Sequence, residues 1–409
     1  MKTRAVTSVY VLAFVGSVGL GAPPRYKLTI LEPSEPGQET AAFGLNEQGD
    51  VAGYERFDNA NRIRASLWRA SGEQVIFDTL PGDYRIWATD VSDLGLVVGT
   101  GIIPAFGSLN VTWASTAENA PLTTNLQVAF NDSGAKDVSV RPGGSEIAGW
   151  LTSADTIGSF FLRQGFLKSD SAIGTPPQLI PRLGGWAGWA NGVSPSRLAV
   201  GASTTSQGPI HAFSFRSGAG VTDLGTLGGN ASEARAISDT DIIVGWANTP
   251  TGERHAFRRD EDVLVDLGTL GGRMSSAEAV NASGVVVGTS WTADDGVAAW
   301  VHADGVMRDL NEQVVGQAGL LLTHATDLNE SGVIIGYGRR DGRTQGFVLE
   351  PTCAADYAEP AGVLDSSDVL SFLVAFQERR QGADVSMPYG SWDIFDVFIF
   401  LEAFGAGCP

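Results

Sequence analysis

The chain has 409 residues, with 27 Lys or Arg and 46 Asp or Glu, so its formal net charge is −19 at pH 7. A chain this acidic lacks the basic footprint that neutralises phosphates, which excludes nucleic acid and anionic membrane surfaces as partners. Its two cysteines, Cys353 and Cys408, lie near the C-terminus, so the preceding chain has no cysteine-based metal site or thiol nucleophile.

Residues 1–21 are typical of a secretory signal peptide. Lys2 and Arg4 precede an apolar run from Val6 to Leu20, and small residues follow it. A transmembrane anchor is the alternative, but the run is shorter than the ~20 residues that a span needs. Cleavage leaves 25 basic and 46 acidic residues, a net charge of −21. We expect a secreted protein, extracellular or at the cell surface, with no membrane span in its mature form.

The pattern that dominates residues 22–350 is an apolar run ending in Gly, repeated seven times at steps of 43 to 52 residues. The phrases end at Gly53, Gly99, Gly149, Gly201, Gly245, Gly288 and Gly336. A period in this range predicts supersecondary units that stack or are arranged radially.

Further phrases recur in register with these glycines. Asp223-Leu-Gly-Thr-Leu-Gly-Gly229 returns at Asp266–Gly272, and His211-Ala-Phe213 returns at His255–Phe257. Each unit holds about four short segments rich in Val, Ile, Thr and aromatic residues, separated by turn residues. We therefore predict an all-β fold, a seven-bladed β-propeller, in which the early strand Tyr26–Leu31 completes the last blade.

The repeats resemble the HAF family of extracellular bacterial repeats, named after the His-Ala-Phe phrase. The similarity covers roughly residues 26–350 and is most specific between residues 211 and 347. It implies a secreted repeat protein, and it implies neither a ligand nor an activity.

Signals for chemistry in residues 22–350 are weak. The four histidines are scattered, and we expect His211 and His255 to have structural roles. No nucleophile elbow, phosphate loop or zinc-binding helix motif is present. We expect no catalytic residues and no enzyme activity, with a glycan as one ligand to consider. The alternative is a carbohydrate-active hydrolase, whose two carboxylates converge from different blades on one rim of the channel.

Residues 351–409 form a second module built from a duplication. Asp356–Asp368 precedes one helical stripe, and Asp384–Asp396, 28 residues later, precedes another. The two acidic loops match at Asp, Pro, Gly, Asp and Asp. In an exported protein, we expect Cys353 and Cys408 to form a disulfide that brackets this module.

An acidic loop followed by a helix, in two copies, resembles the dockerin module of the planctomycete type, which ends in Gly-Cys-Pro as Gly407-Cys408-Pro409 does. The resemblance implies a small α-helical module that attaches its carrier to a protein scaffold or a cell-surface partner and binds Ca²⁺. The oxygen ligands that we expect are carboxylates of both loops: Asp356, Glu359, Asp365, Asp368, Asp384, Asp393 and Asp396.

The loops depart from the standard calcium pattern, because Ala358 and Pro360 stand where ligands are expected. We expect tighter binding in the first loop, where Glu359 corresponds to Met387 of the second. In the alternative, the acids cap the following helices, since carboxylates are favoured at helix starts. The overall prediction is a secreted, non-enzymatic propeller that a calcium-dependent dockerin-like tail attaches to an extracellular partner.

Overall fold

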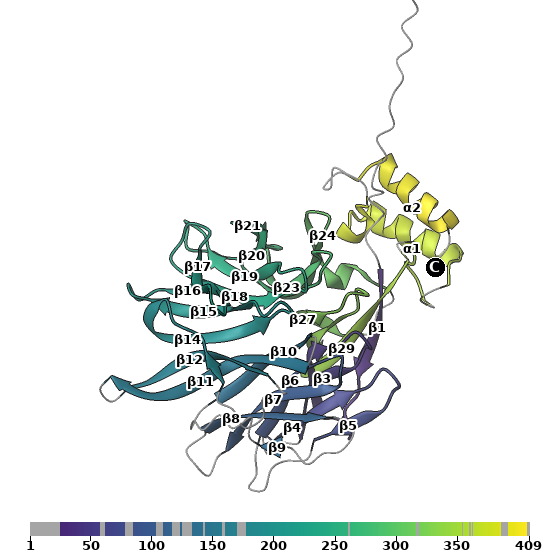
Figure 1. The fold of residues 1–409 in the computed structure, drawn as a ribbon. Helices are drawn as coiled ribbons and strands as arrows, with labels where there is room; N and C mark the ends of the chain where they lie inside the picture. Colours follow the sequence, from purple (N-terminus) through teal and green to yellow (C-terminus); the bar gives the residue numbers. More distant parts are fainter. Residues whose placement is uncertain are drawn as a thin grey trace, which may run out of the picture.

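The structure, a computed structural model, describes residues 25–57, 62–77, 85–103, 109–116, 123–124, 133–141, 144–157, 160–169, 177–260, 262–315, 319–353, 355–359, 361, 363–385 and 392–406. The expected signal peptide, residues 1–21, lies outside the described residues. Strands make up most of the described chain, and two α-helices follow them (Figure 1).

Four sheets each contain four antiparallel strands in chain order. They are β2 (Glu39–Leu45), β3 (Val51–Phe57), β4 (Arg62–Trp68) and β5 (Gln74–Ile76); β6 (Arg85–Val91), β7 (Leu96–Ile103), β8 (Leu109–Thr116) and β9 (Thr123–Thr124); β10 (Ser133–Arg141), β11 (Gly144–Ile157), β12 (Phe160–Ser169) and β13 (Gln178–Leu179); and β14 (Gly184–Val193), β15 (Ala199–Thr205), β16 (Ile210–Arg216) and β17 (Gly220–Gly225).

Two further sheets contain eight and five strands. The first contains β18 (Ser232–Ile237), β19 (Ile243–Asn248), β20 (Arg254–Asp260), β21 (Val263–Gly268), β22 (Gly271–Val280), β23 (Val286–Thr292), β24 (Val297–Ala303) and β25 (Val306–Asp309). The second contains β26 (Val314–Val315), β1 (Arg25–Leu31), β29 (Arg343–Thr352), β28 (Ile334–Arg340) and β27 (Leu321–Leu328).

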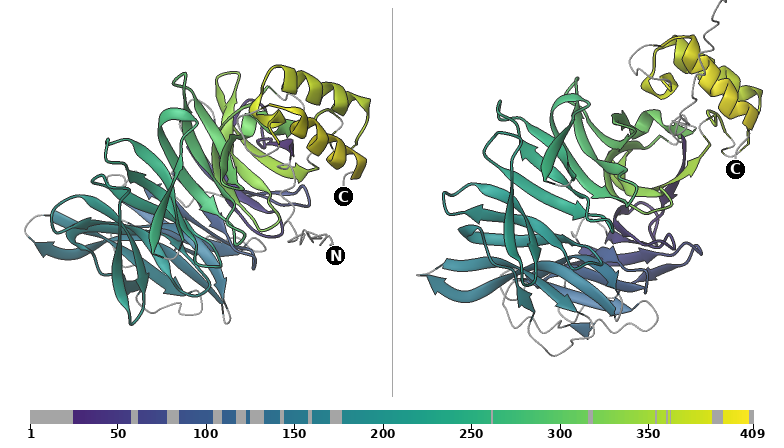
Figure 2. Two further views of the ribbon diagram at one scale, coloured as in Figure 1. Left: turned by 90° about the horizontal axis from the view of Figure 1, so that it is seen from above. Right: turned by 45° about the horizontal axis from the view of Figure 1, so that its top comes forward.

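The sheets follow one another in chain order around a common centre, which is the arrangement of a β-propeller (Figure 2). Apolar side chains fill the space between consecutive sheets. One buried cluster, for example, joins Leu67 and Phe77 of the first four-stranded sheet to Ile86 and Val97 of the next. The prediction of a propeller is confirmed, whereas the count of seven blades stays a prediction.

The two ends of the propeller meet in one sheet. β1 pairs antiparallel with β29 over seven residues, from Arg25↔Thr352 to Leu31↔Gly346. This pairing confirms the predicted role of Tyr26–Leu31 in the last repeat. Because it gives β29 a partner along its length, it removes an open sheet edge.

Helices α1 (Ser366–Gln377) and α2 (Ile394–Ala406) follow the sheets. Of two short 3₁₀ turns, η3 (Leu310–Glu312) lies between β25 and β26, and η4 (Gln381–Ala383) lies between α1 and α2. The α-helices pack through Phe372 and Phe400, whose rings stack with centroids 4.0 Å apart. The Arg25 guanidinium lies 4.1 Å over the Tyr357 ring and so connects β1 to this helical module. Within the described ranges, no helix is long and apolar enough to cross a membrane.

Candidate functional site

The repeated glycines are required by a bulge in the first strand of each repeat. That strand loses register with its neighbour at one residue in all seven repeats, because a single residue is left without a partner. The bulge pushes a carbonyl toward the phrase glycine. A Cβ at Gly201 would lie 2.0 Å from the Trp189 oxygen, and one at Gly288 would lie 2.0 Å from the Ser276 oxygen. Only glycine fits there.

The bulge residues differ from one repeat to the next, although their surroundings repeat. Each follows a buried alanine, and none of the seven is itself buried. In chain order they are Phe43, Thr89, Lys136, Asn191, Arg235, Glu278 and Thr326. All seven line one cavity of about 410 Å³ at the centre of the propeller. The repeat therefore fixes a ring of positions and leaves their chemistry free to vary.

In six of the seven repeats, an aromatic residue lies beside the ring of bulge residues. The position two before the bulge faces the residue after the phrase glycine across the two strands, as Trp87 faces Thr100 and Gly134 faces Trp150. The aromatic members of these pairs are Tyr54, Trp87, Trp150, Trp189, Trp246 and Tyr337. Small residues face four of them, so each large ring has room beside the channel.

Hydrogen bonds and stacking hold the polar side chains near the channel. The indole Nε1–H groups of Trp189 and Trp246 each donate to the Glu233 carboxylate, at 3.1 Å. Arg235 forms an ion pair with Glu278, with Nη1 3.3 Å from Oε2. The Arg254 guanidinium stacks 4.0 Å from the Trp246 ring. Neither Glu233 nor Glu278 is therefore placed as a free general acid or base.

The residues that follow the bulges line a second, acidic cavity of about 200 Å³. Its carboxylates come from several sheets and are Glu47, Asp90, Asp93, Asp137, Asp239, Asp327 and Glu330. This is the convergence of carboxylates that the hydrolase alternative requires.

Most of these carboxylates bind backbone N–H groups of a neighbouring repeat. Asp90 Oδ2 accepts from Val138 at 2.7 Å, and Asp137 Oδ2 accepts from Val193 at 2.6 Å. Asp327 Oδ2 accepts from Leu45 at 2.8 Å, which repeats the same bond between the last repeat and the first. The acids therefore join adjacent repeats around the ring.

A second series of bonds in this cavity closes the ring in the same way. The Glu47 N–H donates to Asp93 at 2.8 Å, the Glu330 N–H donates to Glu47 at 3.0 Å, and the Ala282 N–H donates to Glu330 at 2.7 Å. Each bond runs from one repeat to the next. Most of this acidic cluster thus has a structural explanation.

Burial raises the pKa of several of these acids. It raises the pKa of Asp327 to about 8. The pKa of Asp90 is raised by burial and then by the charge of Asp137, to which its carboxyl is hydrogen-bonded. Burial also raises the pKa of Asp137, and its hydrogen bond to Asp90 acts in the opposite direction. Two carboxyl groups in direct contact disfavour the state in which both are ionised, so the pair is stabilised by sharing one proton.

We expect the stability of the propeller to fall as the pH rises through this range. The ordinary pKa of Asp is about 3.9. Between that value and about 8, the folded form holds on Asp327 a proton that the unfolded form has released. The contribution of protonated Asp327 to the free energy of unfolding is thus complete below about pH 4 and is lost as the pH approaches 8. The free energy of unfolding falls by up to about 1.4 kcal/mol per pH unit in this range.

The free energy of unfolding in urea, measured from pH 4.5 to pH 8.5, tests this expectation. Asp327→Asn should reduce the decline with pH, and the exposed Asp262→Asn should leave it unchanged. Identical slopes for wild type and Asp327→Asn would show that Asp327 does not titrate in this range.

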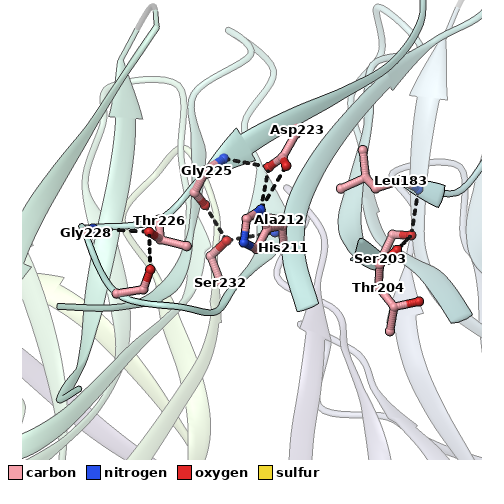
Figure 3. Close-up of polar contacts among 11 residues, drawn as sticks. Leu183, Ser203, Thr204, His211, Ala212, Asp223, Gly225, Thr226, Gly228 and Ser232 are labelled. Atoms are coloured by element: carbon pink, nitrogen blue, oxygen red, sulfur yellow. Dashed lines mark hydrogen bonds and ion pairs between the residues drawn. The ribbon is translucent and has the colours of Figure 1, made fainter. Parts of the chain in front are cut away.

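The histidines of the repeated phrase have a structural partner (Figure 3). His211 Nδ1 lies 2.8 Å from Asp223 Oδ2, and Asp223 Oδ1 accepts from the Gly225 N–H at 2.8 Å. Ser232, on the first strand of the next repeat, accepts from the Ala212 N–H at 2.8 Å. His255 and Asp266 repeat the contact at 2.9 Å. The two recurring phrases of the repeat therefore bind each other and link successive sheets.

In the helical module, the acids expected as calcium ligands cap the helices. Asp368 accepts backbone N–H bonds from Tyr357 at 2.7 Å, Ala358 at 2.9 Å and Asp365 at 2.8 Å. Asp365 in turn caps α1 by accepting from the Ser367 N–H at 2.6 Å, which completes a capping box.

The second copy has the same arrangement. Asp396 accepts from the Val385 N–H at 2.8 Å and from the Asp393 N–H at 2.9 Å. Asp393 accepts from the Phe395 N–H at 2.8 Å at the start of α2. The predicted duplication thus extends to individual hydrogen bonds.

The remaining expected ligands lie in the two loops before the helices. Asp356 and Asp384 are buried near the starts of their loops, and Glu359 accepts from the Ala361 N–H at 3.1 Å. No group of three or more His, Cys, Asp or Glu that could hold a metal occurs in the described part of the chain. The backbone N–H bonds to Asp365, Asp368, Asp393 and Asp396 favour the capping alternative, whereas calcium binding stays a prediction. Cys353 is disulfide-bonded, and Cys408, the only other cysteine, lies outside the described residues.

The ring of bulge residues is not identified by sequence analysis, because its members share no residue type. Their common signal is the alanine immediately before each of them. Successive alanines lie 46 to 55 residues apart in the early repeats and 43 to 48 residues apart in the later ones. That signal becomes useful only when strand register shows that the next residue is the bulge.

Comparison with known proteins supports the fold alone. No family model matches the chain, and no curated protein matches it. Virginiamycin B lyase from Staphylococcus aureus is 13% identical, with a TM-score of 0.44, over 79% of this chain and 99% of that one. An acylaminoacyl peptidase is 9% identical, with a TM-score of 0.50, over 77% of this chain and 52% of that one. TolB from Acinetobacter baumannii is 13% identical, with a TM-score of 0.39, over 74% of this chain and 79% of that one. These proteins share a β-propeller architecture with this chain.

Proposed function

We propose that this chain is a secreted, non-enzymatic binding propeller of seven blades, displayed on an extracellular or cell-surface partner through its C-terminal module. Seven bulges, one in the first strand of each repeat, support the blade count. In this count the eight-stranded sheet is two blades, joined by the single pairing Arg254↔Met274.

The observation that carries the binding function is the contrast between constant and variable positions. Each bulge residue is preceded by Ala and lies in a repeat that carries the same glycine phrase. Even so, six residue types occupy the seven bulge positions. A structural requirement would select one residue type at all seven. Because these different side chains line one central cavity, we assign them to ligand recognition.

A ligand panel tests this assignment. The purified mature chain is screened against polysaccharides and oligosaccharides by intrinsic tryptophan fluorescence. Asn191→Trp places a large side chain in the channel and is expected to weaken binding at least tenfold. Thr222→Trp, on the exposed outer strand β17, is the matched control and should bind like wild type. Equal binding by both variants would place any ligand elsewhere.

The attachment function of the tail is supported by an exposed apolar surface on its helices. Ile394, Phe395, Phe398 and Leu401 of α2 are exposed, as are Leu370, Leu373 and Val374 of α1. A patch of this kind marks a protein interaction site. We propose that it docks onto a protein scaffold or a cell-surface protein, as the dockerin resemblance implies. The HAF resemblance concerns the propeller and not this module.

Retention of the mature protein on washed producing cells tests the attachment. We expect the double change Phe395→Glu with Phe398→Glu to release the protein, and Leu94→Glu, an exposed change on the propeller, to leave it bound. Retention of the double variant would remove the tail from the attachment mechanism.

A second candidate function is the carbohydrate-active hydrolase. The observation that favours it is the hydrogen-bonded pair Asp90 and Asp137, both with a raised pKa, in the acidic cavity. Each carboxylate also binds a backbone N–H of the next repeat, which favours the structural role. Turnover that depends on Asp137 would decide for the hydrolase.

A further inference from the structure

The cavity at the bulge ring has one aromatic side and one polar side. Phe43, Trp87 and Tyr337 line it from the first, second and last repeats, which are neighbours around the ring. Lys136, Asn191, Arg235 and Glu278 line it from the four repeats between them. The volume of about 410 Å³ lies within the range of small-ligand sites, about 300–1,000 Å³. A ligand that fills it has one flat apolar face and one polar edge.

The polar side carries excess positive charge in a protein whose net charge is strongly negative. Lys136 and Arg235 line the cavity, and Arg163 and Arg254 interact electrostatically with this pair from outside the lining. The carboxylates that oppose these four charges are Glu233 and Glu278. Desolvation and the charge of Arg235 lower the pKa of Lys136. Among the described residues, no carboxylate forms an ion pair with Lys136, whereas Arg235 is paired with Glu278. An anion at Lys136 would balance this charge.

Groups that recognise hydroxyls also line the cavity. Asn191 donates both amide hydrogens to Glu233 and Ala234, which fixes its side chain beside the channel. The Thr289 hydroxyl lines the same cavity and is buried without a hydrogen-bond partner in the described structure. Because an unmade hydrogen bond of this kind is costly, the hydroxyl is suited to a polar ligand atom.

We propose that this cavity binds an acidic saccharide, a pyranose ring bearing a carboxylate or a sulfate ester, with Lys136 as the contact for the negative charge. The proposal rests on the binding function proposed above. The apolar face of the ring stacks against Trp87, beside Tyr337, whose ring stacks on His324 with centroids 4.5 Å apart. The hydroxyls of the ring lie toward Asn191 and Thr289. A neutral sugar leaves Lys136 unpaired, and an aromatic acid leaves Thr289 unpaired.

Titration calorimetry of the mature chain with four probes tests the proposal: tetragalacturonic acid, its full methyl ester, a sulfated carrageenan tetrasaccharide and phenylacetate. We expect at least one acidic saccharide to bind at least tenfold more tightly than the ester and phenylacetate. Lys136→Met should weaken that binding at least tenfold. Lys27→Met is the matched control, because Lys27 pairs with Glu350 on β29, away from the channel. Equal melting temperatures verify that both variants are folded.

The two acidic probes separate the sources of charge, since preference for one identifies a carboxylate or a sulfate ester. The inference is overturned if the ester binds as tightly as the acids, if neither acid binds, if phenylacetate binds best, or if Lys136→Met has no effect. If a neutral glycan binds the wild type and does not bind the Asn191→Trp variant, the proposed binding function remains intact. If no saccharide of any kind binds, the proposed function fails as well.

Discussion

Replacement of Gly201 by Ala is expected to destabilise the propeller by at least about 3 kcal/mol, because the new Cβ would overlap the backbone of the neighbouring strand. That Cβ would lie 2.0 Å from the Trp189 carbonyl oxygen and 2.9 Å from the Ala190 Cα. Both atoms belong to the bulged backbone of β14, which cannot move away without breaking the pairing of β14 with β15.

Gly188→Ala in the same sheet provides the matched control. The nearest heavy atom to its added Cβ, Ser203 Oγ, lies 3.4 Å away, an ordinary contact distance. The free energy of unfolding in urea should therefore be much lower for Gly201→Ala than for wild type. For Gly188→Ala it should differ from wild type by less than about 1 kcal/mol. Equal effects of the two substitutions would mean that the repeated glycine is not a steric requirement of the bulge.

Asp368→Ala is expected to unfold the helical module while leaving the propeller folded. The substitution leaves three backbone N–H groups, those of Tyr357, Ala358 and Asp365, without their acceptor. The Tyr357 N–H is buried and the bonds of the other two are partly buried. An orphaned buried donor costs about 1–3 kcal/mol. We expect a separate, low-temperature melting transition in the variant. Glu359→Ala, which removes one bond to the exposed Ala361 N–H, is the control and should melt like wild type.

The same melting experiment decides the role of calcium in the tail. If Asp368 and Asp396 act as helix caps, the transition is the same in calcium and in chelator. A bound ion at a hundredfold excess over its Kd would raise stability by about 2.7 kcal/mol. A transition that shifts upward with calcium would contradict the capping account and support the ligand set expected from the dockerin resemblance.

The turns and the strand content of the fold are predictable because they depend on local chemistry. Asn281 accepts from the Val285 N–H at 3.0 Å, and Gly284 has a φ of 83°, as the Asn-Ala-Ser-Gly turn requires. The pairing of β1 with β29 is also predictable, since the first strand resembles the strand that the last repeat lacks. Periodicity and turn residues determine both features.

The channel is not predictable in the same way because it depends on strand register. Arg235 and Asp327 lie next to the channel because of bulges, and the alanine before each bulge does not by itself reveal the strand register. The carboxyl pair of Asp90 and Asp137 joins residues of adjacent repeats, and 46 acidic residues offer many pairs of that kind. In the tail, composition alone leaves open whether Asp368 binds a cation or caps a helix. The hydrogen bonds favour the cap.

The central claim is that the propeller binds a ligand in its channel without chemical turnover. The most direct test incubates the mature protein with each saccharide that quenches its tryptophan fluorescence and analyses the products by mass spectrometry. The account predicts saturable quenching, loss of that quenching in Asn191→Trp, and recovery of the saccharide intact. Cleavage of the saccharide by wild type but not by Asp137→Asn would contradict it and assign the acidic cavity to catalysis.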